Sequence, residues 1–88
     1  MMESPENRLR RLKMRSMRRG IKEMDIILMR FAEEHLERLD AAELDCYEML
    51  LEENDQDLYQ WVTGQTAAPE TLAAMIEMIV RALPKVEP

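Results

Sequence analysis

Residues 6–68 contain no proline, and Gly20 and Gly64 are the only glycines in the chain. Proline and glycine are the two residues that most disfavour a helix interior, so almost the whole chain is free to be helical. The nine methionines favour helix as well. No segment shows the alternation of apolar and polar residues that indicates a strand. The sequence therefore predicts an all-α protein.

Start and stop signals divide the chain into five predicted helices, which we expect to form a compact five-helix bundle. Ser4 and Pro5 supply a hydroxyl N-cap and a first-turn proline, and Gly20 is expected to end the first helix in a left-handed conformation. Asp40 begins the third helix with the spacing of a capping box, and Asp55 is expected to cap the fourth. The predicted ranges are about 5–18, 22–35, 40–51, 55–64 and 69–83.

Each predicted helix carries apolar residues at helical spacing, and together these supply one core. In the fifth helix they follow the i, i+3, i+4, i+7, i+8 pattern. The predicted core consists of Leu9, Leu12 and Met17; Met24, Ile27, Leu28, Phe31 and either His35 or Leu36; Leu44, Tyr47, Leu50 and Leu51; Leu58, Trp61 and Val62; and Leu72, Met75, Ile76, Ile79, Val80 and Leu83. A chain of 88 residues is expected to form a single domain, here 1–88, with the termini 1–4 and 85–88 frayed.

The sequence offers little from which a catalytic or metal site could be built. Two glycines are too few for a phosphate-binding loop, and one His and one Cys cannot supply a metal cluster from a single chain. His35 is expected on the core side of its helix, and the acids beside Cys46 disfavour a reactive thiolate. No apolar run approaches the roughly 20 residues needed to cross a bilayer. We therefore expect no catalytic residue, no bound metal, no tightly bound cofactor and no membrane insertion.

Charge is divided unevenly along the chain, whose net charge is −6. Residues 1–30 hold nine Lys and Arg against four Asp and Glu, whereas residues 31–88 hold three against fourteen. The acidic whole disfavours non-specific binding to nucleic acid, although the basic first helix remains a local patch of positive charge.

Two short motifs stand out. The junction between the first two helices reads Arg-Arg-Gly-Ile-Lys-Glu-Met-Asp over residues 18–25, and Asp-Gln-Asp-Leu-Tyr-Gln-Trp follows at 55–61. A purely structural interpretation accounts for the first motif, because cations near one helix end, a glycine cap and acids in the next first turn are all favoured. Arg-Gly-x-x-Glu alone is therefore a weak functional signal.

With both motifs at this spacing, residues 8–83 closely resemble the FAD assembly factor family of succinate dehydrogenase, also called the succinate dehydrogenase assembly factor 2 family. Gln56 departs from the family pattern, in which proline is common between the two aspartates. The resemblance implies a small five-helix bundle that binds the flavoprotein subunit of succinate dehydrogenase, and in bacteria that of fumarate reductase. It also implies that the protein promotes covalent attachment of FAD to a histidine of that subunit, so that FAD is the cofactor of the partner.

We hypothesise that the first motif is the docking site. The expected partner-binding residues are Arg18, Arg19, Gly20, Ile21, Glu23 and Asp25. The missing side chain of Gly20 would let the partner's backbone approach, and Arg19 would bind a carboxylate through two hydrogen bonds. Glu23 would pair with a cation of the partner or hold Arg19 in place. Such a factor would align histidine and flavin rather than transfer a group.

Two other interpretations stay open at this point. The basic helix between Arg8 and Arg19 could serve a regulatory or antitoxin-like protein that binds nucleic acid or another protein, although it has no interleaved aromatic residue. The same arginines could belong to a mitochondrial targeting segment, but Glu3 and Glu6 precede them. We expect a bacterial cytoplasmic protein, or a mitochondrial matrix protein if the source is eukaryotic, that is monomeric when free and has no nucleic-acid partner.

Overall fold

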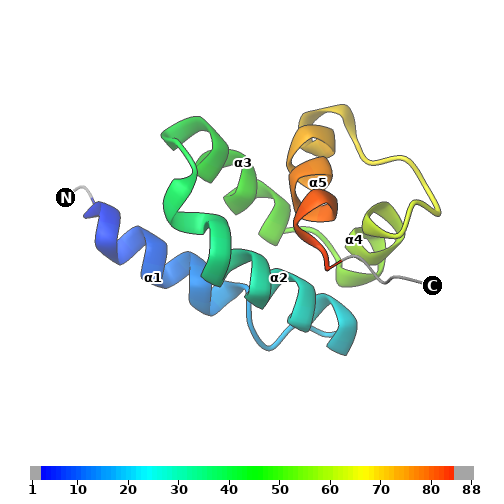
Figure 1. Cartoon of the computed structure of the whole chain (residues 1–88), viewed down its shortest axis with the longest axis horizontal. Coiled ribbons are helices and arrows are strands. Elements are labelled where there is room, and N and C mark those ends of the chain that lie inside the picture. The colour runs from blue at the N-terminus through cyan, green and yellow to red at the C-terminus, as the bar shows by residue number, and fades with distance from the viewer. Residues whose placement is uncertain (1–2, 85–88) are drawn as a thin grey trace.

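The computed structural model describes residues 3–84, which form five α-helices and one short 3-10 helix (Figure 1). The elements are α1 (Pro5–Arg15), α2 (Lys22–His35), η1 (Leu36–Arg38), α3 (Ala41–Leu51), α4 (Asp55–Val62) and α5 (Glu70–Ala82). No strand occurs within residues 3–84, and the all-α prediction is confirmed. Fraying was predicted for 1–4 and 85–88; of these, 1–2 and 85–88 lie outside the described residues, and the fraying stays a prediction.

Helix α2 lies at the centre of the arrangement and packs against α1, α4 and α5. Helix α3 packs on α5, while α1 runs alongside α2 at one end of the molecule (Figure 1). None of the helices within residues 3–84 combines the length and the apolar composition needed to cross a bilayer. This arrangement brings the loop between α1 and α2 against the junction between α3 and α4, which are distant in sequence.

Most helix ends follow the predicted signals. The Ser4 hydroxyl accepts a hydrogen bond at 3.1 Å from an amide in the first turn of α1. Asp40 and Glu43 form the predicted reciprocal capping box, with hydrogen bonds of 2.8 and 2.9 Å. Helix α5 begins at Glu70, one residue after the predicted start at Pro69, which takes the N-cap position. These local signals are reliable because they satisfy backbone amides that the first turn of a helix leaves without partners.

The predicted cap of α4 is wrong by one residue. Asn54, not Asp55, occupies the N-cap position, and its side chain accepts a hydrogen bond from the Gln56 amide at 2.8 Å. Asparagine and aspartate are about equally good caps, so the sequence alone does not choose between neighbours. As a consequence, the carboxylate of Asp55 is available for contacts elsewhere.

The end of the first helix is also predicted wrongly. Helix α1 ends at Arg15, three residues early, and the left-handed residue of the following loop is Arg18, with φ of 57°, rather than Gly20. At this point Ser16 is fully buried, and its hydroxyl donates to the Leu12 carbonyl at 2.8 Å. A side-chain hydrogen bond of this kind competes with continued helix.

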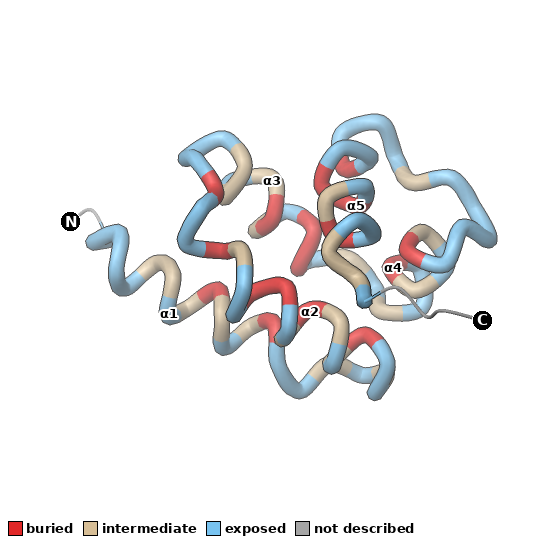
Figure 2. The backbone as a smooth tube through the Cα atoms, in the orientation of Figure 1, coloured by how far each residue is buried: buried red, intermediate tan, exposed pale blue. Residues whose placement is uncertain are grey.

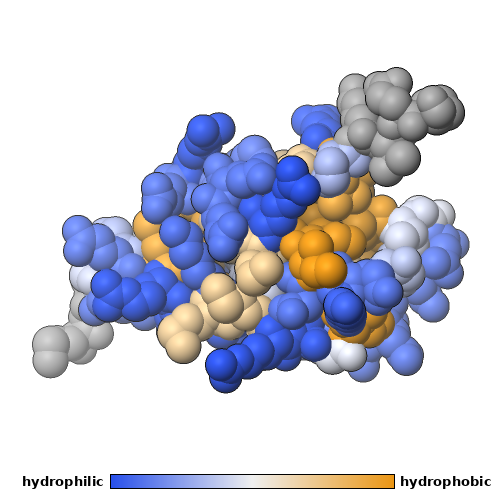
Figure 3. Space-filling model, turned by 60° about the horizontal axis from the view of Figure 1, so that its bottom comes forward, coloured by the Kyte–Doolittle hydropathy of each residue, from blue (hydrophilic) through white to orange (hydrophobic). Residues whose placement is uncertain are grey.

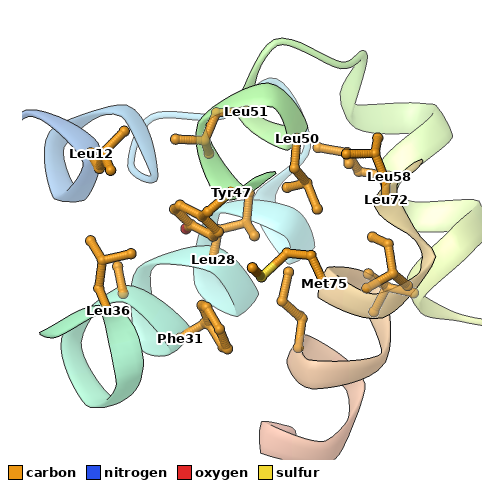
Figure 4. Close-up of a cluster of buried hydrophobic side chains, with 14 of the residues drawn as sticks. Leu12, Leu28, Phe31, Leu36, Tyr47, Leu50, Leu51, Leu58, Leu72 and Met75 are labelled. Atoms are coloured by element: carbon orange, nitrogen blue, oxygen red, sulfur yellow. The ribbon is translucent and has the colours of Figure 1, made fainter. Parts of the chain in front are cut away.

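Apolar side chains from all five helices form one core. Figure 2 shows that each helix contributes buried positions to it. Tyr47 of α3 is its largest fully buried side chain and lies among leucines of the neighbouring helices (Figure 4). Its hydroxyl lies 2.6 Å from the Ser16 hydroxyl, and burial raises the pKa of Tyr47 to about 12. The buried apolar residues are Leu12, Met24, Leu28, Phe31, Ala32, Leu36, Leu39, Tyr47, Leu50, Leu51, Leu58, Val62, Leu72, Met75, Ile76 and Ile79.

Several predicted core positions lie at the edge of the core or outside it. Leu36, not His35, takes the buried position at the end of α2, and Trp61 is only half-buried. Met17 is 38% exposed because it follows the early end of α1, and Val80 is 41% exposed. At 3.6 residues per turn, Val80 is rotated about 80° from Leu72, which places it beside the apolar stripe.

Candidate functional site

The side chain of Arg19 turns into the protein. Its Nε donates to Asp55 Oδ1 at 2.7 Å, and the two side chains are only 12% and 16% exposed. Its terminal nitrogens donate to the backbone carbonyls of Arg15, Leu51 and Glu53 at 3.2–3.3 Å. Arg19 therefore ties the loop between α1 and α2 to the junction between α3 and α4.

Asp55 also holds the next residue of that loop. The Gly20 amide donates to Asp55 Oδ2 at 2.5 Å. A Cβ atom added to Gly20 would lie 3.1 Å from the same oxygen, which is closer than an ordinary van der Waals contact. One carboxylate of the second motif thus binds both residues of the Arg-Gly pair. We call this unit, made of Arg19, Gly20 and Asp55, the Arg-Gly clamp.

The other predicted docking residues differ in their exposure. Arg18 and Glu23 are exposed, as is Gly20. Ile21 is half-buried and packs against the core. Asp25 is half-buried and accepts a long hydrogen bond from the loop backbone at 3.4 Å. The six residues therefore lie in one region, in which some face outward and others support the loop.

The alternative in which Glu23 holds Arg19 in place is not what the structure shows, because Asp55 does so. Glu23 takes part in none of the ion pairs found among residues 3–84. Asp55 was predicted only as a helix cap, and its role as an anchor was missed. The sequence held only one sign of this contact, namely that the two motifs occur together. Arg19 and Asp55 are 36 positions apart, and spacing along the chain does not reveal a contact over that separation.

Much of the positive charge of α1 is neutralised within the protein. The ion pairs are Arg8 with Asp45 and Glu48, Arg11 with Glu3 and Glu48, and Arg15 with Glu52, at 2.6–3.2 Å. The hydrogen bond from the Arg11 guanidinium holds the pKa of the Glu48 carboxyl below its usual value. Because of these pairs, the surface offers a nucleic acid less positive charge than the number of arginines in the sequence suggests.

His35 and Cys46, whose residue types can act as catalytic groups, both have structural surroundings. The His35 ring is half-buried, with its centroid 5.3 Å from that of Phe31. Cys46 Sγ donates to the Thr71 carbonyl at 3.4 Å, and burial raises the pKa of the Cys46 thiol. Within residues 3–84, no group of three or more His, Cys, Asp or Glu side chains is placed to hold a metal ion.

Known proteins match this chain over most of its length. The family model described as a flavinator of succinate dehydrogenase matches residues 10–83, a segment that contains both motifs. The FAD assembly factor SdhE of Vibrio cholerae is 42% identical over 64 residues, which are 72% of this chain and 74% of that protein.

Fungal proteins named succinate dehydrogenase assembly factor 2, mitochondrial, are also similar. The one from Meyerozyma guilliermondii is 46% identical over 61 residues, which are 69% of this chain and 45% of that protein. The one from Schizosaccharomyces pombe is 38% identical over 68 residues, or 77% and 49% of the two chains. The chain thus spans less than half the length of these fungal relatives. Since the family model covers residues 10–83, the chain belongs to the family of flavinators of succinate dehydrogenase.

Proposed function

We propose that this protein is an assembly factor that binds the flavoprotein subunit of succinate dehydrogenase and promotes covalent attachment of FAD to a histidine of that subunit. The family model and the names of the relatives support this proposal. One structural observation supports the choice of site: Asp55 of the second motif holds Arg19 and Gly20 of the first. Two motifs that are separate in sequence thereby become parts of one surface.

In this proposal the six motif residues have different tasks. Arg18, Gly20 and Glu23 are exposed and would contact the partner directly, together with the exposed part of Ile21. Arg19 would act indirectly, because its guanidinium is occupied by Asp55 and backbone carbonyls. Asp25 would support the loop from α2 in the same way. The loop would thus meet the partner already ordered, which lowers the entropic cost of binding.

The factor itself would carry out no bond-forming step. The histidine and the FAD would both belong to the partner, and the factor would hold them in alignment, which is a positioning effect. On this proposal the protein is not an enzyme. It acts as a monomer in the bacterial cytoplasm, or in the mitochondrial matrix if the source is eukaryotic, with the flavoprotein subunit of fumarate reductase as a second client.

The proposal is tested by reconstitution. Purified flavoprotein subunit without flavin is incubated with FAD, with and without the factor, and covalent flavin is measured by fluorescence of the denatured subunit. A faster rise with the factor supports the function, and an unchanged rate rejects it. Glu23→Ala should weaken binding to the subunit, whereas Glu33→Ala, an exposed acid of the same helix, should not. Equal affinities of the two variants would remove Glu23 from the docking site and leave the function standing.

A further inference from the structure

A hydrophobic hollow lies beside the motif surface, between α2 and the end of α4. It is lined by Glu23, Ile26, Ile27, Tyr59, Val62, Thr63 and Leu83. On the face shown in Figure 3, hydrophobic side chains gather toward the right, among hydrophilic ones. Glu23 is the only charged residue of the lining, and it is also a residue of the first motif. The hollow is therefore continuous with the proposed docking surface.

The edge of this hollow exposes an apolar side chain that the core does not use. Ile26 is 51% exposed, whereas its neighbour Ile27 is packed against the core and Val62 opposite is 6% exposed. Single exposed aliphatic residues are common on protein surfaces. Here the exposed side chain borders a concave apolar lining, which is the arrangement found where a partner side chain is buried.

The charge at the edge indicates the chemistry of the occupant. Glu23 is exposed and belongs to none of the ion pairs among residues 3–84. The Thr63 hydroxyl donates to the Tyr59 carbonyl at 2.7 Å, so this polar group of the lining is already satisfied. An apolar side chain would fill the hollow, and a neighbouring Lys or Arg of the partner would complement Glu23.

We propose that this hollow is the second half of the docking surface and receives an apolar side chain of the flavoprotein subunit that has a basic residue beside it. The inference rests on the proposed function, since it takes the partner from there. It adds to the motif surface three contacts outside the motif, namely Ile26, Val62 and Leu83. The partner would then span from the Arg-Gly clamp on one side to the end of α5 on the other.

Methyl NMR tests the proposal directly. The full chain, labelled at Ile, Leu and Val methyl groups, is titrated with purified flavoprotein subunit. We expect the signals of Ile26, Val62 and Leu83 to shift or broaden together with that of Ile21 in the motif, while Leu9 on α1 stays unchanged. If Ile21 responds while Ile26, Val62 and Leu83 do not, the proposal that the hollow binds the partner is wrong, and the proposed function still stands. If no methyl signal responds, both proposals fail.

A pair of matched variants provides the second measurement. Ile26→Asn and Met49→Asn each replace an apolar helix residue that is about half exposed, at 51% and 54% respectively. Met49 lies on α3, outside the hollow. We expect Ile26→Asn to weaken binding to the flavoprotein subunit about tenfold, and Met49→Asn to bind like the unmodified chain. Equal affinities overturn the proposal, as would a loss of folding in Ile26→Asn, since the side chain would then belong to the core.

Discussion

Replacing Asp55 with alanine should destabilise the protein by about 2 kcal/mol. Removing one partner of a fully buried ion pair costs about 3–5 kcal/mol, and an exposed pair is worth about 0–1 kcal/mol. The Arg19–Asp55 pair lies between these limits, because the side chains are 12% and 16% exposed. In the variant Arg19 would keep its hydrogen bonds to three backbone carbonyls, which lowers the cost. The Gly20 amide is exposed, so it would donate its hydrogen bond to water instead of to Asp55, at little further cost in stability.

This cost is a large part of the total stability of so small a domain. Globular proteins have a free energy of unfolding of about 0.05–0.15 kcal/mol per residue, which gives roughly 4–13 kcal/mol for a chain of 88 residues. A loss of about 2 kcal/mol would lower Tm by roughly 8–16 °C. Urea titration followed by circular dichroism at 222 nm, together with a thermal melt, measures both quantities. The native helices would persist in the variant at low temperature, because Asn54 still caps α4.

Asp57→Ala is the matched control for this experiment. Asp57 also lies in the first turn of α4, but it is exposed. Its loss removes only a favourable interaction with the helix dipole, of about 0.3–1 kcal/mol. The reasoning is refuted if Asp55→Ala is no less stable than Asp57→Ala. A double-mutant cycle with Arg19→Ala should also give a coupling energy of about 1–2 kcal/mol, and additive losses would show that the ion pair is not the cause.

Three further perturbations follow from single contacts. Tyr47→Phe should cost about 1 kcal/mol, because the buried Ser16 hydroxyl loses a hydrogen-bond partner; urea titration measures this cost. Since the folded pKa of Tyr47 is about 12, above the unfolded value near 10, the unmodified chain should lose stability between about pH 10 and 12, and Tyr47→Phe should lose less over the same range. The pKa of Glu48 is lowered in the folded state, so its stabilising effect is present above the unfolded pKa and is lost as pH falls through the folded one; Glu48→Gln should flatten the acid limb of a stability profile. Gly20→Ala should cost about 1 kcal/mol in a thermal melt, because the added Cβ would press on the Asp55 carboxylate, and an unchanged Tm would show that this carboxylate moves away freely.

The sequence predicted the helices well because their signals are local. The capping box at Asp40, the proline before α5 and the stripes at helical spacing each depend on residues within a few positions of one another. Such patterns satisfy the backbone and bury one face regardless of the rest of the fold. Errors arise at the edges of these patterns, as at Val80 and Met17.

The sequence identified the residues of the first motif, but it did not reveal how the folded chain holds them. The Arg-Gly pair was identified from its motif, yet its guanidinium was expected to face the partner. Three facts of the folded chain change that expectation: α1 stops early at the buried Ser16, Arg18 adopts the left-handed conformation, and Asp55 lies beside the loop. The contacts of Ser16 with Tyr47 and of Arg19 with Asp55 join residues far apart in sequence, which periodicity and spacing do not encode.

The ion pairs between α1 and α3 have a consequence for how this protein behaves among polyanions. In the folded chain Arg8 and Arg11 pair with carboxylates of α3, and Arg15 pairs with Glu52 directly after it. The native state therefore partly neutralises charges that the unfolded chain would expose. A partly unfolded preparation would therefore adhere to nucleic acid in a salt-sensitive manner even if the native protein does not. The native fold thus limits non-specific binding to polyanions. This protection is lost when α1 separates from α3.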